Sequence, residues 1–135
     1  MKTLKYISTL SLFLVIIYAC SSNPIKNNSN SKEEPVVIKN DSLEYEIIII
    51  DPGFTNYLNT IARPVGYYSK TYLANKNRFY VPIWNLRVND PFNFNSNIYE
   101  NQINYKPDID YGYEVNYKLF NYFEFAQRKY RINLR

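Results

Sequence analysis

The chain of 135 residues contains no histidine, a single cysteine and only three glycines. Without histidine it has no imidazole for general acid–base catalysis, for a Ser-His-Asp triad or for metal coordination. One cysteine cannot form an internal disulfide or a zinc–thiolate site, and three glycines are too few for a glycine-rich phosphate loop. We therefore predict no cofactor, no bound metal, and no nucleotide-dependent or thiol-dependent catalysis.

The first twenty residues have the pattern of an export signal. Lys2 and Lys5 precede an apolar stretch over residues 6–19, which falls short of the roughly 20 apolar residues that a membrane span needs. The letters "IYAC", ending at Cys20, resemble the lipobox of bacterial lipoproteins, in which the cysteine is acylated and becomes the mature N-terminus. Acylation would also remove a lone reactive thiol from an oxidising compartment. An ordinary cleaved signal and an uncleaved anchor are the alternatives.

This pattern predicts three parts in the chain. Residues 1–19 are expected to be a signal peptide, and residues 20–42 a lipidated cysteine followed by a disordered tether rich in Ser, Asn, Lys and Pro. Residues 43–135 are expected to form one globular domain. We predict an exported protein, anchored in a lipid bilayer of the bacterial cell envelope through acylated Cys20. The outer membrane is the expected location, and the side that the domain faces stays open.

The charge balance does not indicate a polyanionic partner. The formal net charge is +4, and it falls to +2 when Lys2 and Lys5 leave with the signal peptide. Nucleic-acid-binding domains usually carry a much larger and clustered positive charge. We therefore predict no nucleic acid among the partners.

The domain is expected to open with a strand and a helix. Residues 44–50, "EYEIIII", form a β-branched run that ends at a turn. The apolar residues that follow recur at the spacing of one helix face, at Phe54, Tyr57, Leu58 and Ile61. A second helix is predicted over residues 68–79, interrupted or restarted at Pro82 and continuing to Asn89. Residues 99–105, "YENQINY", are predicted to be a second strand that pairs with the first.

The C-terminal tail allows two interpretations at its start, since alternation typical of a strand overlaps a helical stripe. The stripe consists of Val115, Leu119, Phe123, Ala126 and Tyr130. The tail contains no proline after Pro107 and is too long for an ordinary strand, so we predict a helix with Asp110 as its cap. The expected fold class is α+β: a small, helix-rich single domain with a short sheet.

Four carboxylates are the candidates for catalysis. Asp51 precedes Pro52 where the strand meets the helix, which is typical of a helix N-cap with proline at the first helical position. It could instead be a catalytic acid at a strand end. Asp108, Asp110 and Glu114 could form a carboxylate pair of the kind that hydrolyses glycosides, or could be loop acids that cap a helix. The catalytic alternative is therefore a small carboxylate-based hydrolase of envelope glycans.

Tyrosine is the most unusual part of the composition, with 15 residues. Tyrosine combines apolar area with a polar tip, which suits surfaces that bind proteins or sugars. It can equally replace leucine in the core of a small domain. The candidates for an aromatic binding surface, with a polar anchor, are Arg63, Tyr67, Tyr68, Trp84, Tyr111 and Tyr113.

Several longer strings together resemble one known family: "EIIIIDPGF", "ARPVGYYS", "YLANKNRFYV", "WNLRV" and "IYENQINYKPDIDYGYEVNYKLFNYF". They are similar to a family of lipoproteins from the Bacteroidota that is known only as a domain of unknown function. The resemblance spans residues 44–130 and implies a membrane-tethered single domain in the cell envelope. It implies no activity, ligand or catalytic residue. The preferred hypothesis is thus a non-enzymatic binding or assembly module, whose partner is an envelope protein or glycan.

Overall fold

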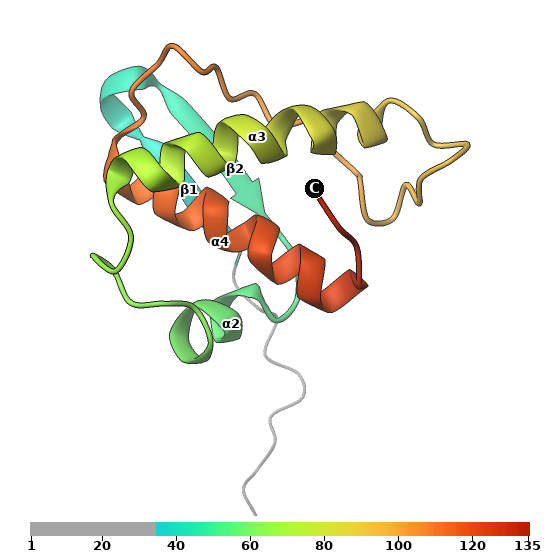
Figure 1. Ribbon diagram of the computed structural model, residues 1–135, viewed down its shortest axis with the longest axis horizontal. Helices are drawn as coiled ribbons and strands as arrows, with labels where there is room; N and C mark the ends of the chain where they lie inside the picture. The colour runs from blue at the N-terminus through green and yellow to red at the C-terminus, as the bar shows by residue number, and fades with distance from the viewer. Residues whose placement is uncertain (1–34) are drawn as a thin grey trace, which may run out of the picture. The chain divides into compact units, whose positions relative to one another are not determined.

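The computed structural model describes residues 35–135. The predicted signal peptide, Cys20 and most of the predicted tether lie outside the described residues. The described part has the expected α+β architecture, with a two-stranded antiparallel sheet and three α-helices (Figure 1). In chain order the elements are β1 (Val36–Asn40), the 3₁₀ turn η1 (Asp41–Leu43), β2 (Tyr45–Ile49), α2 (Phe54–Thr60), α3 (Lys70–Val88) and α4 (Gly112–Tyr130).

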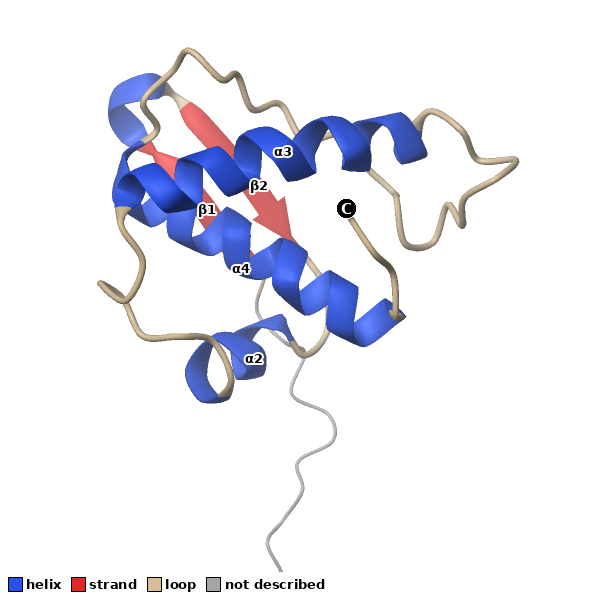
Figure 2. Cartoon of the chain, viewed as in Figure 1, coloured by secondary structure: helices blue, strands red, loops and turns tan. Residues whose placement is uncertain are grey.

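The sheet is a hairpin formed by neighbouring segments. β1 and β2 pair in antiparallel register from Val36↔Ile49 to Asn40↔Tyr45, and η1 connects them (Figure 2). This corrects the predicted boundary, because β1 lies inside the segment assigned to the tether. The five residues "VVIKN" contain three β-branched side chains, and Ile38 is fully buried. The strand was not predicted because it is short and the residues on both sides of it are polar.

Residues 99–105 do not form the predicted second strand. β1 already pairs with β2 through a short connection, which costs less closure entropy than a distant partner. Side chains of α3 bind the backbone of this segment instead. Asn85 donates from Nδ2 to Ile103 O and accepts from Ile103 N at Oδ1, at 2.9 and 2.8 Å. The segment is therefore held as an irregular loop against α3.

Helix α3 runs without a break through Pro82, where the sequence predicted an interruption. Proline lacks the N–H that would bind the carbonyl of Arg78. Pro82 is exposed, whereas Val81 and Trp84 beside it are buried in the core. Burial of these neighbours keeps the helix continuous across the missing hydrogen bond.

Helix α4 lies at the centre of the domain, where it contacts α3, α2 and β1 (Figure 1). The predicted stripe is confirmed, since Val115, Leu119, Phe123 and Ala126 are all buried. The predicted cap is not, because Tyr111 is the N-cap residue and makes no side-chain cap bond. The rest of the core is largely aromatic. Among the described residues, no helix is both long and apolar enough to cross a membrane.

Candidate binding surface at the aromatic loop

The six predicted binding residues separate into two groups. Arg63, Tyr67, Tyr68 and Tyr113 come together around the connection between α2 and α3. The other two, Trp84 and Tyr111, are buried in the core and cannot offer an exposed ring.

The two buried rings use their polar tips inside the domain. Trp84 Nε1 donates to Asn101 O at 3.1 Å, and the Tyr111 hydroxyl accepts from Lys106 N at 3.0 Å. Sequence reasoning placed both on the surface because an aromatic-rich composition does not reveal which rings are buried. Their hydrogen bonds hold the loop between α3 and α4, so their role here is structural.

Residues 61–69, called here the aromatic loop, leave α2 and enter α3 through a tight turn. Tyr67 N donates to Pro64 O at 3.1 Å, and Gly66 between them has a φ of 90°. A positive φ at the third position of such a turn favours glycine over other residues. Ser69 ends the loop as the N-cap of α3, where its hydroxyl accepts from Tyr72 N.

Two tyrosines of α4 fix the loop through their hydroxyl groups. Tyr117 OH donates to Arg63 O at 2.7 Å. Tyr113 OH accepts from Gly66 N at 2.7 Å and donates to Tyr68 O at 3.2 Å. Tyr113, one of the predicted binding residues, is half-buried, and its hydroxyl helps to hold the backbone of the loop. These three bonds hold the backbone of an otherwise exposed loop in one conformation.

The outward side of the aromatic loop is apolar and aromatic. The Tyr67 side chain is 57% exposed and meets Tyr68 edge-on, with ring centroids 4.7 Å apart. Tyr68 in turn stacks on Tyr72 of α3 at 4.7 Å, with an angle of 13° between the rings. The Arg63 guanidinium lies 5.1 Å from the Tyr67 ring centroid, a cation–π distance. Contiguous exposed apolar area of this kind is typical of a binding surface.

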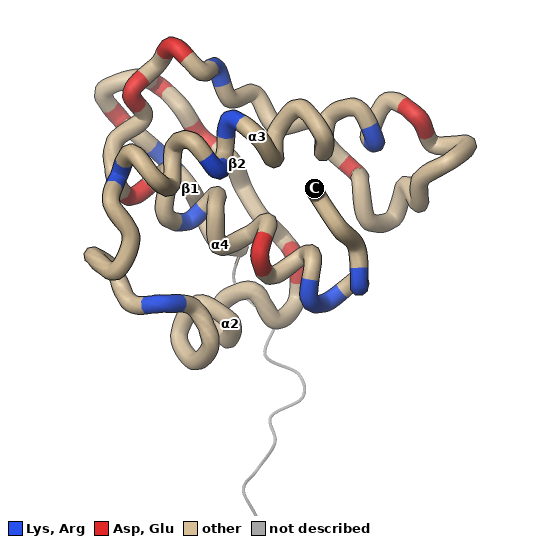
Figure 3. Tube along the Cα trace, in the orientation of Figure 1, with Lys and Arg blue, Asp and Glu red and all other residues tan. Residues whose placement is uncertain are grey.

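The chain segment that contains the aromatic loop carries charges of one sign only. Residues 52–89 contain no aspartate or glutamate but five basic residues, namely Arg63, Lys70, Lys76, Arg78 and Arg87. Figure 3 shows Lys and Arg along the loop and α3. Lys76 Nζ lies 5.8 Å from the ring centroids of Tyr72 and Tyr80. Sequence reasoning did not include Tyr72 and Lys76, although the acid-free stretch was a signal that could have identified them.

The sequence predicted that Asp51 caps α2, and this prediction is wrong. The N-cap is Gly53, which has a φ of 96°, and Pro52 stays outside the helix. The Asp51 carboxylate turns instead to the C-terminal end of α4, where Lys129 Nζ and Tyr130 OH both donate to it. Burial alone would lower the pKa of Lys129, but the hydrogen bond and charge of Asp51 outweigh burial and raise this pKa.

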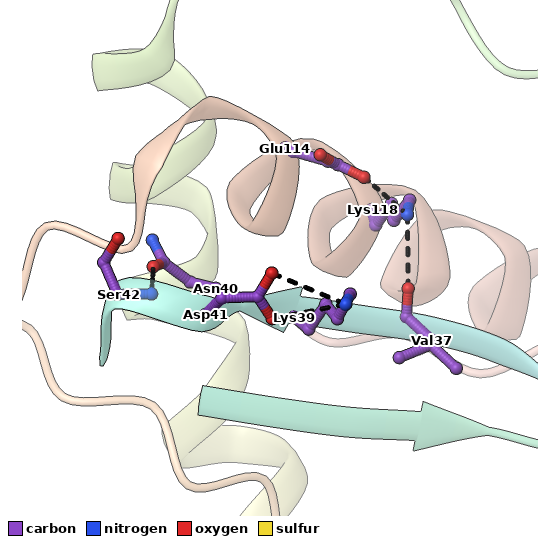
Figure 4. Close-up of polar contacts among 7 residues, drawn as sticks. All are labelled: Val37, Lys39, Asn40, Asp41, Ser42, Glu114 and Lys118. Atoms are coloured by element: carbon purple, nitrogen blue, oxygen red, sulfur yellow. Dashed lines mark hydrogen bonds and ion pairs between the residues drawn. The ribbon is translucent and has the colours of Figure 1, made fainter. Parts of the chain in front are cut away.

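The other three acids lie at the opposite end of α4, around its start. Asp110 accepts from Lys70 Nζ at 2.6 Å and from Gly112 N at 3.0 Å. These hydrogen bonds, together with the charge of Lys70, lower the pKa of Asp110. Glu114 pairs with Lys118 one helical turn away at 2.7 Å (Figure 4). Asp108 is exposed.

The structure does not gather the four predicted acids into one site. Asp51 lines one hollow of the surface, Asp108 and Asp110 line another, and Glu114 lines neither. Residues 35–135 also contain no group of three or more Asp, Glu, His or Cys side chains that could hold a metal ion. Two catalytic carboxylates must flank the same bond. Only Asp108 and Asp110 of the four predicted acids share a hollow, and Asp110 already accepts hydrogen bonds from Lys70 Nζ and Gly112 N.

Comparison with known proteins gives one match. A family of unknown function, DUF6146, matches residues 7–135. The chain belongs to this family. The match covers all of the described domain, including the aromatic loop and β1. No curated protein and no solved structure matches the chain. Membership of this family assigns no activity or ligand to the chain.

Proposed function

We propose that this protein is a lipid-anchored component of the bacterial cell envelope whose folded domain binds an envelope partner through the aromatic loop. The observation that carries the proposal is the set of hydroxyl bonds from Tyr113 and Tyr117 to the backbone of an exposed loop. Ordering a loop before binding reduces the conformational entropy lost on association. The proposed role is binding or assembly rather than catalysis.

The chemistry of the loop indicates a partner that carries carboxylates. Tyr67 of the loop and Tyr72 of the adjoining helix α3 are both exposed. The cationic groups of Arg63 and Lys76 lie beside these two rings. Arginine binds carboxylates through two parallel hydrogen bonds, and this geometry gives directional recognition. Acidic side chains of a protein and the uronic or lactyl acids of a glycan both supply this group.

Photo-crosslinking in intact cells tests this proposal. A photoreactive amino acid replaces Val65, which lies at the exposed turn of the loop, or Phe92, which is the matched exposed control on the loop after α3. We expect a discrete adduct from position 65 that disappears with Arg63→Glu, and no such adduct from position 92. Digestion with protease or with glycan-degrading enzymes then identifies the kind of partner. Identical adducts from both positions, or adducts that Arg63→Glu leaves unchanged, would contradict the proposal.

The lipid anchor is tested separately with Cys20→Ala. Cells grown with an alkyne-tagged fatty acid should label the wild-type protein and leave the variant unlabelled. The variant should also leave the membrane fraction. Labelling that persists in Cys20→Ala would show that the anchor is not on this cysteine, and it would leave the result at the aromatic loop unaffected.

A further inference from the structure

The two edges of the sheet differ in how far the rest of the domain covers them. Along β1, the Lys118 ammonium of α4 donates to Val37 O at 3.2 Å and is also paired with Glu114 (Figure 4). In the same view α4 lies on the side of β1 that faces away from β2. One edge of the sheet is therefore covered by a helix and a charged side chain.

The register shows where the backbone groups of β2 point. In an antiparallel pair, facing residues alternate between pairs that exchange hydrogen bonds and pairs whose N–H and C=O point outward. Val37 faces Ile48, and Val37 O points toward Lys118, away from β2. Val37 and Ile48 are therefore a pair of the second kind. The N–H and C=O of Ile48 point away from β1, and so do those of Glu46, which is two residues earlier.

This outward edge of β2 is open. No backbone group of residues 35–135 outside the hairpin bonds to Ile48 or Glu46. The strand also lacks the features that usually protect an edge, since it has no proline, no bulge and only one charged residue, Glu46. The Ile48 and Ile50 side chains are 55% and 76% exposed. Unpaired edges with exposed β-branched residues are templates for another strand.

A groove of about 230 Å³ lies along this edge. Residues 47–50 of β2 and its continuation line it together with residues 97–98 and 100–103. The aromatic side chains of Trp84 and Tyr122 also line it. None of the residues that line the groove belongs to the aromatic loop, so the two surfaces are distinct.

The geometry points to a strand-addition site: the free edge of β2 receives one extended segment of a partner protein as a third strand. Alternate side chains of an added strand face the two sides of the sheet, so one apolar side chain enters the groove. The charged residues that line the groove are Asp51 and Glu100, both acidic, and Lys129 already pairs with Asp51. A lysine or arginine next to the apolar residue of the segment complements Glu100.

A second copy of this chain fits the same edge less well. In a pairing between two β2 strands, the residues that face the core side are Ile47 and Ile49 of each copy. Ile49 is buried in its own domain, and Ile47 packs against the same core. Neither can also fill the groove of the other copy. A free segment brings a side chain that is not committed elsewhere.

Binding of peptide libraries to the full-length protein in detergent tests the inference. Short peptides carry varied apolar residues at alternate positions, with a flanking lysine in one set and a glutamate in the matched set. Trp84 is the single tryptophan and lines the groove, so its fluorescence reports occupancy. We expect binders from the lysine set, and we expect N-methylation of their β2-facing amides to abolish binding. No binder in either set, or equal binding by the N-methylated peptide, would overturn the inference.

Two variants at one position separate the backbone from the side chain. Ile48→Pro removes an N–H that the pairing with β1 does not use, whereas Ile48→Thr keeps it. Peptide affinity should fall about tenfold in Ile48→Pro and stay near wild type in Ile48→Thr. Equal affinity in both variants would overturn the inference. So would a concentration-dependent dimer of the wild type that Ile48→Pro abolishes, since a second copy would then occupy the edge.

Discussion

At each end of α4 there is an ion pair between a lysine and an aspartate that are far apart in the sequence, and the two pairs differ in burial. At the C-terminal end, Lys129 pairs with Asp51, whose side chain is only 10% exposed. At the N-terminal end, Asp110 pairs with Lys70 and is 66% exposed. Water and salt screen the second pair, while the first is enclosed by Tyr130 and the chain around Pro52. We therefore expect loss of the Lys129–Asp51 contact to destabilise the fold more than loss of the Lys70–Asp110 contact.

The largest effect is expected from Asp51→Asn. The substitution keeps the shape of the side chain but removes the charge that Lys129 and Tyr130 both contact. We expect a loss of about 2 kcal/mol in the free energy of unfolding, measured by urea denaturation. A double-mutant cycle with Lys129→Met isolates the pair, because Asp51→Asn should cost less once Lys129 is gone. Equal costs in both backgrounds would show that the pair does not act as argued.

Tyr130→Phe should have the next largest effect. The hydroxyl is 3.0 Å from both carboxylate oxygens of Asp51, and its removal leaves the ring in place. The expected loss is about 1 kcal/mol in the free energy of unfolding. Tyr67→Phe is the matched control on the exposed aromatic loop and should change stability very little. If the two substitutions have the same effect, the Tyr130 hydroxyl adds nothing to the buried pair.

A smaller effect is expected in how the stability loss caused by Asp51→Asn changes with pH. The pKa of Lys129 is raised despite its burial, and burial together with Asp51 raises the pKa of Tyr130. A group whose pKa is higher in the folded state than in the unfolded state contributes its full stabilisation of the fold at pH values below its unfolded pKa. This contribution is lost as the pH rises through the folded pKa. The gap in stability between wild type and Asp51→Asn should be full at about pH 8 and narrow above about pH 10.

Other groups that titrate at alkaline pH contribute to both proteins. Burial raises the pKa of Tyr80 to about 12, with the charge of Glu124 adding to it, so wild type and variant both lose stability there. The difference between their unfolding free energies removes this shared part. A gap that stays constant across the alkaline range would mean that Asp51 does not raise the pKa values of Lys129 and Tyr130.

The smallest effect is expected from Asp110→Asn at the other end of α4. The lowered pKa of Asp110 reflects hydrogen bonds made at the surface, where solvent screens the charge. We expect no measurable change in the midpoint of thermal unfolding, with or without added salt. A drop as large as that of Asp51→Asn would remove the distinction between the two ends.

The sequence predicted those parts of the fold that depend on local periodicity. The isoleucine run of β2, the apolar face of α2 and the stripe of α4 are each recognisable within a short segment. Burial follows the stripe of α4, whereas Ile61, predicted on the face of α2, lies after the end of that helix and is 53% exposed. β1 was missed because five residues with one fully buried side chain, Ile38, carry too little pattern within a polar segment. Residues 99–105 alternate as a strand would, but hydrogen bonds from Asn85 determine their path.

The candidate site could be predicted only in part, for a similar reason. Arg63, Tyr67 and Tyr68 are neighbours in the sequence and lie together on one loop. Tyr113 supports that loop from 45 residues away, and nothing near it in the sequence indicates this contact. Asp51 shows the same limit, since its cap pattern is local while its true partner, Lys129, is 78 residues away. Local chemistry predicts which residues are suited to a role, and the fold decides which residues perform it.

The position of β1 has a mechanical consequence. A pulling force applied to the chain before β1 reaches the domain at this strand. Its first residue, Val36, pairs with Ile49 at the end of the hairpin farthest from η1. Pulling β1 away would break its ladder with β2 and its contact with Lys118 together, and would uncover Ile38. The first strand after the predicted anchor is thus held by β2 on one side and by α4 on the other. A force on the N-terminal segment has to break the contacts of β1 with β2 and with α4 before the rest of the domain unfolds.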